Sequence, residues 1–349
     1  MSRKEGRWWG KMTELIKKKA YERLISDVGT LLEEARKKVY TDIDQTLVKT
    51  YWEIGRKVIE FEQEGKEKAE YGSELLANLS TDLKLRYGKG FSKSNVYLMR
   101  LFYLKYQKFQ TVSGKLGWSH YAELLGISED LERSFYEKQC IQEKWSVREL
   151  KRQKNSALFE RIALSKNKSG VLKLAQQGHI ITKVDDVVKD PYVLEFLGIS
   201  EESEYSEKEL EQKIIDNLQK FLLELGKGFA FVARQFRITL GNKHYYVDLV
   251  FYHRILKCFV LIDLKIGKVG HSDIGQMNTY LNYFKAEEMV EGDNEPIGII
   301  LSADKDKFLV EYALGGISNK LFVSKYKLYL PDKKELEEKV RKILKTSGI

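Results

Sequence analysis

Cysteine and proline are scarce in this sequence, and no apolar run approaches the roughly 20 residues that a membrane helix needs. The 349 residues include two cysteines, Cys140 and Cys258, and three prolines. Two isolated cysteines exclude a disulfide framework and show no metal-ligand spacing. So little proline excludes a Pro-rich disordered chain. The basic, aromatic N-terminus lacks the apolar segment of a secretory signal. We therefore expect an ordered cytoplasmic protein with no membrane segment.

Acidic residues are absent from one long stretch, residues 83–122, although the chain as a whole carries 51 of them against 60 Lys and Arg. The stretch has aromatic residues between its positive charges and two predicted helices around Gly88 and Gly90. A phosphate-binding surface is one interpretation. A basic, solvated face over an aromatic core is the other. The candidates for nucleic-acid binding are Lys84, Arg86, Lys89, Lys93 and Arg100.

The hydrophobic pattern changes along the chain and predicts at least two domains. Residues 11–164 show apolar side chains three and four apart, which indicates a helical N-terminal domain that binds DNA or a partner. Residues 165–206 begin with a small, polar segment and are interpreted as a linker with connecting helices. From residue 207 to 349 the pattern predicts a helix, strands at 229–240, 244–252 and 257–265, a helix, and further strands. This order is typical of an α/β domain with a mixed sheet.

Two carboxylates and a lysine lie on the second and third of these strands. Asp263 and Lys265 project from the same face because side chains alternate along a strand. A two-residue turn at 255–256 would place Asp248 directly opposite Asp263. A four-residue turn at 253–256 would make the two residues diagonal neighbours, and the absence of Gly or Asn from this turn favours the longer loop. Either even-length turn predicts that the three side chains converge.

Neighbouring carboxylates repel each other unless a cation lies between them. Oxygen ligands of this kind suit Mg²⁺ or Mn²⁺. A nearby lysine can orient a water molecule towards a phosphodiester, while the metal stabilises the charge that develops on the phosphate. The alternative is a strand end that meets solvent, with the lysine simply paired to its aspartate.

These residues resemble the PD-(D/E)XK nuclease signature. Val247-Asp248 followed by Asp263-Leu264-Lys265 matches its core, and Gln276 with Tyr280 resembles the QxxxY motif of the RecB-like branch. Longer runs are similar to the bacterial YhcG-like family, at 117–127, 190–199, 221–235, 245–267, 275–283 and 296–306. Two departures are Val247 in place of the signature proline and Asp263 in place of glutamate. Neither removes a metal ligand.

The resemblance implies an α/β fold with a restriction-endonuclease-like mixed sheet flanked by helices, preceded by an all-α N-terminal domain. It implies a Mg²⁺- or Mn²⁺-dependent nuclease that hydrolyses DNA with a metal-activated water. A catalytically silent nucleic-acid- or protein-binding module of a defence or recombination assembly is the alternative. DNA is the expected partner, and a protein partner or a homo-oligomer is compatible with the sequence.

The same resemblance implies the role of each candidate residue. Asp248, Asp263 and the Leu264 carbonyl would hold the metal, and Lys265 would position the water. Gln276 and Tyr280 would orient the site or contact the substrate strand. The family usually adds a glutamate from the helix before the sheet. Glu211 and Glu224 are both candidates, and we favour Glu224 because it lies within the family-like run 221–235.

Overall fold

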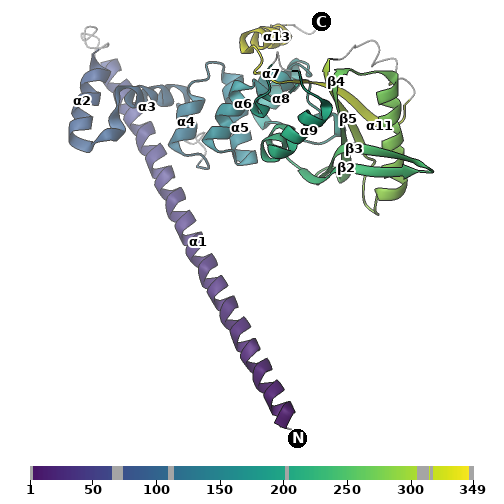
Figure 1. The fold of residues 1–349 in the computed structure, drawn as a ribbon. Coiled ribbons are helices and arrows are strands. Elements are labelled where there is room, and N and C mark those ends of the chain that lie inside the picture. The colour runs from purple at the N-terminus through teal and green to yellow at the C-terminus, as the bar shows by residue number, and fades with distance from the viewer. Residues whose placement is uncertain are drawn as a thin grey trace. The chain divides into compact units, whose positions relative to one another are not determined.

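The computed structural model divides into two compact units, Met1–Gly126 and Ile127–Ile349. Figure 1 shows the first unit as helical and the second as helices around a sheet. The structure describes residues 3–64, 74–108, 114–200, 204–304, 314 and 317–345, with side chains from residue 25 onward except those of 37, 40 and 41. In this described part of the chain, no helix combines the length and apolarity needed to cross a bilayer.

The first unit consists of α1 (Arg3–Glu64), α2 (Leu75–Tyr87), η2 (Lys89–Phe91), α3 (Lys93–Lys105) and α4 (Trp118–Leu124). Helices α1 and α3 approach each other closely at Gly55, where an added Cβ would lie 2.0 Å from the carbonyl oxygen of Met99. A side chain at this position would therefore force the two backbones apart. Beside this crossing, the indole N–H of Trp52 donates to the carbonyl of Tyr106 at 2.6 Å.

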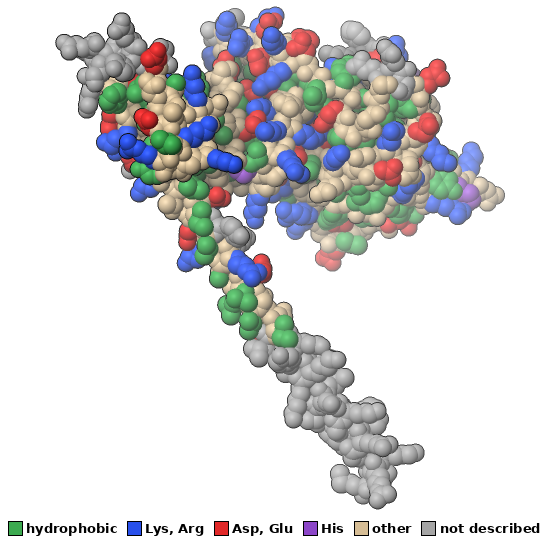
Figure 2. Space-filling view, turned by 60° about the vertical axis from the view of Figure 1, so that its left-hand side comes forward, with side chains coloured by type: hydrophobic (Ala, Val, Ile, Leu, Met, Phe, Trp, Pro, Cys, Tyr) green, Lys and Arg blue, Asp and Glu red, His purple; other side chains and the backbone are tan. Residues whose placement is uncertain are grey.

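The described N-terminal part of α1 is exposed and carries a series of apolar side chains, seen as green atoms along the helix in Figure 2. They are Ile25, Val28, Leu31, Leu32, Val39, Ile43 and Leu47, each at least 40% exposed. The buried core of the first unit begins one residue further on, at Val48. Among the side chains of α1 that the structure describes, those that contribute to this core therefore begin at Val48.

The second unit contains eight helices among its described residues. They are α5 (Asp130–Glu143), α6 (Val147–Asn155), α7 (Leu158–Ala163), α8 (Lys168–Gln177), α9 (Glu207–Asp216), α10 (Leu218–Leu225), α11 (His271–Tyr283) and α13 (Lys333–Lys345). Its strands are β1 (Tyr192–Val193), β2 (Phe229–Leu240), β3 (Lys243–His253), β4 (Cys258–Lys268), β5 (Ile297–Asp304) and β6 (Lys320–Lys327). Short helices of other types complete it. They are the 3-10 helices η4 (Val184–Asp186) and η5 (Glu195–Leu197) and the π-helix η6 (Phe284–Glu288).

The strands form one mixed sheet in the order β1-β6-β5-β4-β3-β2. The ladders among β1, β6, β5 and β4 are parallel, whereas β4, β3 and β2 pair antiparallel. Helices α9 and α10 pack on one face, where Leu210 and Phe221 join the core around Ile262. Helix α11 packs on the other, where Met277 contributes to the core around Leu261. The predicted mixed sheet flanked by helices, with a helical region before it, is therefore confirmed.

The division between the units differs from the domain boundaries expected from the sequence. Helices α5–α7 were expected in the helical domain 11–164, but they pack within the second unit. Arg152 of α6 and Arg161 of α7 form ion pairs with Glu224 of α10. The expected linker 165–206 contains α8, with Asn167 as its N-cap, and β1, which pairs with β6. Buried ion pairs and a strand ladder thus join these segments to the sheet.

Candidate metal centre

The candidate site lies where β3 and β4 separate. Their last ladder pair is Leu249 with Ile262, so the same register continued by one residue places Asp248 opposite Asp263. Beyond this pair, a side chain takes the place of the backbone partner on β3: Asp248 Oδ2 accepts a hydrogen bond from Leu264 N at 2.8 Å. The acid therefore holds β4 in place at the point where ordinary strand pairing ends.

The turn between these strands combines the two arrangements considered from the sequence. Four residues, 254–257, connect the strands, and His253 pairs with Cys258. The loop has the longer length, but it begins one residue later than expected. The register is consequently the one in which Asp248 and Asp263 are directly opposite, and the diagonal arrangement is wrong. A positive φ of 49° at Lys257 closes the turn without glycine.

Asp263 and Lys265 of β4 form the centre of the site. Asp263 is 2% exposed, and its Oδ2 lies 3.2 Å from Lys265 Nζ. Burial and the neighbouring charge of Asp248 raise the pKa of Asp263 to about 7. Lys265 Nζ also lies 3.6 Å from Glu207 of α9 and 4.0 Å from Asp273 of α11. Burial acts to lower the pKa of Lys265, but Asp263, Glu207 and Asp273 outweigh burial and raise it. The three acids thus favour the ammonium form of the side chain.

A third acid reaches the same site from α9. The side-chain amide of Gln235 donates to Glu211 Oε2 at 2.6 Å and to Asp248 Oδ1 at 2.9 Å. Arg234 Nε lies 3.1 Å from the other Glu211 oxygen. Neighbouring residues of a strand project to opposite faces, yet Arg234 and Gln235 both reach one carboxylate, and Gln235 adopts a positive φ of 47°.

Glu224, the favoured helix acid, lies in a different environment, and we correct that assignment. It is fully buried, and its Oε1 accepts from Arg161 at 2.8 Å and from Val193 N at 3.0 Å, while Oε2 accepts from Arg152 at 3.2 Å. Burial acts to raise its pKa, but Arg161, Lys189 and Arg152 lower it to about 2. Both oxygens are therefore occupied by cationic partners, and Glu211 is the helix acid that reaches the site.

Gln276 and Tyr280 support the site from α11. Their side chains are hydrogen-bonded to each other, and the Tyr280 hydroxyl donates to the carbonyl of Tyr246 at 3.0 Å. Tyr280 is fully buried, which excludes the substrate contact that was one of its expected roles. It instead holds β3 two residues from Asp248, so its role would be positioning.

The donor set fits a divalent cation. In the described part of the chain, Asp263 Oδ2 and Glu211 Oε1 are buried side-chain oxygens without a hydrogen-bond partner. Together with Asp248 they offer three carboxylates, the oxygen ligands that Mg²⁺ and Mn²⁺ prefer, although their oxygens do not all lie within 4.8 Å of one another here, because the Gln235 amide lies between Glu211 and Asp248. Leu264 N points towards β3, and the carbonyl of the same residue points to the same side of an extended strand. The Leu264 carbonyl is thus directed towards the acids as well.

A second group of acids, in the same unit, already has a cation. Ligand atoms of Glu132, Glu160 and Glu337 lie within 4.8 Å of one another. The ammonium of Lys333 lies 2.6 Å from Glu132, 4.0 Å from Glu160 and 3.8 Å from Glu337. A lysine thus supplies the positive charge that these carboxylates need, and the cluster attaches α13 to the helices before the sheet.

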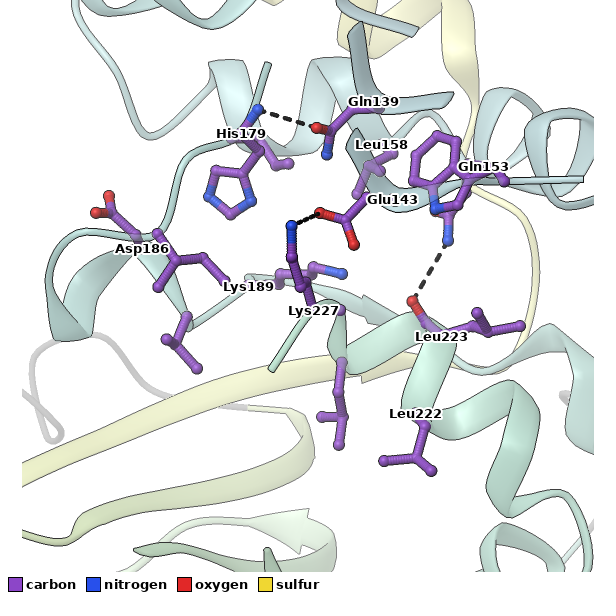
Figure 3. A pocket seen from close by; sticks show the side chains of 16 residues that line it. Gln139, Glu143, Gln153, Leu158, His179, Asp186, Lys189, Leu222, Leu223 and Lys227 are labelled. Carbon is purple, nitrogen blue, oxygen red and sulfur yellow. Dashed lines mark hydrogen bonds and ion pairs between the residues drawn. The ribbon is translucent and has the colours of Figure 1, made fainter. Parts of the chain in front are cut away.

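A cavity of about 170 Å³ lies elsewhere in the second unit, and Figure 3 shows its lining. Glu143 and Lys227 face each other across it at 3.9 Å, and the His179 ring also lines the cavity. Burial lowers the pKa of Lys189, another lining residue, to about 8. The described lining of this cavity includes no group of three acids that could hold a metal ion.

The structure separates the predicted nucleic-acid-binding residues into two groups. Lys84, Arg86, Lys89 and Lys93 are exposed on α2, η2 and α3. Arg100 is half-buried, and its guanidinium forms an ion pair with Glu62 of α1 at 2.8 Å. The expected phosphate contact of Arg100 is therefore corrected, because the packing of α1 against α3 provides it with an internal partner.

Several site residues were not identified from the sequence. Glu207 and Asp273 near Lys265 belong to the first turns of α9 and α11, where acidic residues are common for local reasons. The choice of Glu224 over Glu211 rested on the family-like run 221–235, but the two glutamates belong to different helices, because α9 ends at Asp216 and α10 begins at Leu218. A sequence signal for that break was present in Asn217, a residue with low helix propensity.

Two family models match this chain, and one curated protein is similar to it over nearly its whole length. Residues 185–341 match the model of the YhcG PDDEXK nuclease domain, and residues 27–161 match that of the DUF1016 N-terminal domain. The chain is 39% identical to "Putative nuclease YhcG" of Escherichia coli K12, over 92% of this chain and 93% of that protein.

Solved structures with a partial likeness include a repair endonuclease from Pyrococcus abyssi and EndoMS in its dsDNA2 complex. They are 21% and 17% identical, and each alignment covers 38% of this chain and 50% of the other with a TM-score of 0.26. The family itself rests on the matches over the two domains and nearly the whole chain. The chain belongs to the YhcG family of proteins with a PDDEXK nuclease domain.

Proposed function

We propose that this protein is a divalent-metal-dependent nuclease that hydrolyses DNA phosphodiester bonds. The observation that carries the proposal is the placement of Asp263 beside Lys265 and opposite Asp248, with Glu211 linked to Asp248 through the Gln235 amide. Two of these carboxylates have buried oxygens that no hydrogen bond satisfies. Lys265 and Arg234 offset part of this negative charge, at 3.2 Å from Asp263 and 3.1 Å from Glu211, but a divalent cation would offset the charge of all three acids.

Each residue would have a distinct part in the reaction. Glu211, Asp248, Asp263 and the Leu264 carbonyl would hold Mg²⁺ or Mn²⁺. When bound, the metal supplies charge stabilisation at the phosphate and favours a reactive water. The Lys265 ammonium would orient a water whose oxygen forms the bond to phosphorus while the bond to the leaving oxygen breaks; the proton lost by the water would pass to solvent, and solvent would protonate the leaving oxygen. Asp263, Glu207 and Asp273 raise the pKa of Lys265 and so favour its ammonium form, which suits orienting the water.

Gln235 has a place in this proposal as well. Its amide N–H groups now lie between Glu211 and Asp248, where they neutralise part of the repulsion between two acids. A cation held by the same carboxylates would take over that role. Rotation of the amide would then turn its oxygen, also a hard ligand, towards the metal or its water.

The test is a cleavage assay on linear, circular and branched DNA with Mg²⁺, Mn²⁺ or EDTA. Asp263→Asn and Lys265→Ala should both lose cleavage by orders of magnitude, while the exposed Asp216→Asn serves as a matched control. Calorimetric titration with Mn²⁺ separates the two variants. Asp263→Asn should bind the metal more weakly, and Lys265→Ala should bind it nearly as the parent does.

Two results would contradict the proposal. Equal cleavage by the parent and by folded Asp263→Asn would assign the activity to another site or to a contaminant. No cleavage by the parent on any DNA form with either metal would favour a binding module that retains the fold without the reaction.

A further inference from the structure

The far half of the β2–β3 hairpin has one buried face and one exposed face. Its buried face joins the core under α11 through Phe236, Ile238, Tyr245 and Val247. Its exposed face carries the cross-strand pairs Arg237–Tyr246 and Thr239–His244. In Figure 1 these two strands extend beyond the rest of the sheet. The hairpin therefore presents a single polar surface, which we call the hairpin face, defined by Arg237, Thr239, His244 and Tyr246.

The hairpin face carries one positive charge, that of Arg237, and no acid. Lys243 lies at the turn beside it, and residues 225–247 contain no Asp or Glu. Neither Arg237 nor Lys243 forms a salt bridge with any described residue, and the Arg237 guanidinium contacts the His244 ring at 3.1 Å. Figure 2 shows Lys, Arg and His side chains gathered at this end of the second unit. A surface of this charge is complementary to phosphate.

The hairpin face begins beside the candidate metal centre. Arg237 and Tyr246 lie two residues beyond Gln235 and Asp248 on their respective strands, a step of about 7 Å. The backbone of Tyr246 is fixed by the hydrogen bond from Tyr280, while its side chain is 46% exposed. An aromatic ring is thus held open to solvent on a rigid backbone, one step from the acids.

We infer that the hairpin face binds the DNA strand next to the scissile phosphate, with Arg237 on a phosphate and the Tyr246 ring stacked on an unpaired base. This inference rests on the proposed function and specifies its substrate as DNA with a single-stranded segment at the cleavage point. Stacking on exposed aromatic rings is the usual way in which proteins hold unpaired bases.

The buried face of the hairpin argues against a duplex ligand. A free two-stranded ribbon can enter the major groove, which is about 12 Å wide. Here the core under α11 covers one side of the ribbon as far as Ile238, which is fully buried. Only the tip beyond it could enter a groove. A flat surface backed by protein suits a strand lying across it, and in a paired duplex the bases would be unavailable to Tyr246.

The experiment measures DNA binding by fluorescence anisotropy in EDTA, where no hydrolysis occurs. The probes are a labelled single strand, a gapped duplex and an intact duplex of the same sequence. The variants are Arg237→Ala, Tyr246→Ala and Tyr246→Phe. Arg254→Ala is the matched control, because this exposed arginine lies at the opposite end of β3.

The expected results differ between the variants. Tyr246→Ala should weaken binding to the single strand and the gapped duplex on the order of tenfold, with intact duplex unchanged and Tyr246→Phe close to the parent. Arg237→Ala should reduce the log–log salt slope on the single strand by about 0.7. Arg254→Ala should leave both quantities unchanged.

Other outcomes overturn the inference. Equal loss on all three probes, or loss on intact duplex alone, would mean that the face binds paired DNA. Variants that behave like Arg254→Ala would remove the hairpin face from DNA binding altogether. The proposed function is judged separately, since an uncleaved substrate that still binds through Tyr246 would reject the nuclease while leaving this inference intact.

Discussion

Exchanging Glu224 for glutamine should destabilise the protein, whereas exchanging Glu211 should abolish its reaction. The two glutamates were the competing candidates for the helix acid, and the structure gives them opposite environments. Glu224 accepts from Arg161 and Arg152 in a fully buried position. Glu211 has one buried oxygen without a hydrogen bond and is linked to Asp248 through a glutamine amide. The paired substitution therefore distinguishes a structural carboxylate from a functional one.

The size of the Glu224→Gln effect follows from the partners that remain. Glutamine can still accept from Val193 N and Arg161, which share Oε1, but its amide is neutral, and its N–H groups would face the donors of Arg152, the partner of Oε2. Removing one partner of a buried ion pair costs about 3–5 kcal/mol. For a unit of this size, that loss corresponds to a decrease in Tm of about 6–20 °C. Glu211→Gln should change Tm by a few degrees at most, because it removes repulsion with Asp248 as well as the contact with Arg234.

The assay combines thermal unfolding, followed by circular dichroism, with DNA cleavage at a temperature where both variants are folded. Glu224→Gln should retain cleavage there, and Glu211→Gln should lose it together with Mn²⁺ binding. The reasoning would be refuted by a Glu224→Gln protein of unchanged Tm that no longer binds Mn²⁺. It would equally be refuted by a Glu211→Gln protein with full cleavage.

Three further predictions concern other parts of the chain. Burial and Glu132 raise the pKa of Glu160 from 4.5 to about 7, so its ionisation opposes folding and stability falls as the pH rises through this range. Glu160→Gln should therefore raise stability at pH 8 by up to about 3 kcal/mol, with no gain at pH 4.5, in urea titrations at both values. Gly55→Ala should lower the stability of the first unit by about 2 kcal/mol or more in the same titrations, because the new methyl group meets a backbone carbonyl. Arg100→Ala should leave the salt dependence of duplex DNA binding unchanged, because Arg100 is paired with Glu62. Neutralising Lys84, Lys89 or Lys93 should each lower the slope of log affinity against log salt concentration by about 0.9 if that lysine contacts a phosphate.

Local signals explain why much of the fold could be predicted. The strands of the hairpin and their Gly241-Asn242 turn follow from β-branched and aromatic residues around a tight turn, and the ladder does end at Leu240 with Lys243. The meeting of Asp248 with Asp263 follows from strand alternation and an even turn. These are properties of residues close together in the chain, so the sequence contains them directly.

The environment of Glu224 could not be predicted for the opposite reason. Its partners Arg152 and Arg161 precede it by 72 and 63 residues, and they belong to helices that were expected in another domain. The family models divide the chain after residue 161, whereas the compact units divide it after Gly126. Helices α5–α7 thus match the N-terminal family model yet pack within the second unit. A carboxylate that looks like a ligand in one helix can then be neutralised by side chains that no local pattern connects to it.

The orientation of the hairpin face depends on a second feature that alternation does not reveal. Ala233 and Phe236 pack on the same core although they are three residues apart, and so do Val250 and Val247. The alternation of side chains between the two faces therefore shifts by one residue on each strand. The shift occurs at Gln235 on β2 and at Asp248 on β3, and φ of Gln235 is positive. Strict alternation would place Arg237 and Tyr246 against α11, where burying a guanidinium without a partner is costly. The slip turns them to solvent and at the same time brings Gln235 onto the acids. One irregular position thus both connects Glu211 to the metal centre and exposes the surface next to it.

Because the two effects share one backbone distortion, Gln235→Ala should weaken the link between the acids without removing a charge. Mn²⁺ affinity and single-strand affinity should fall together in that variant, and a loss of only one of them would show that the distortion is maintained by other contacts.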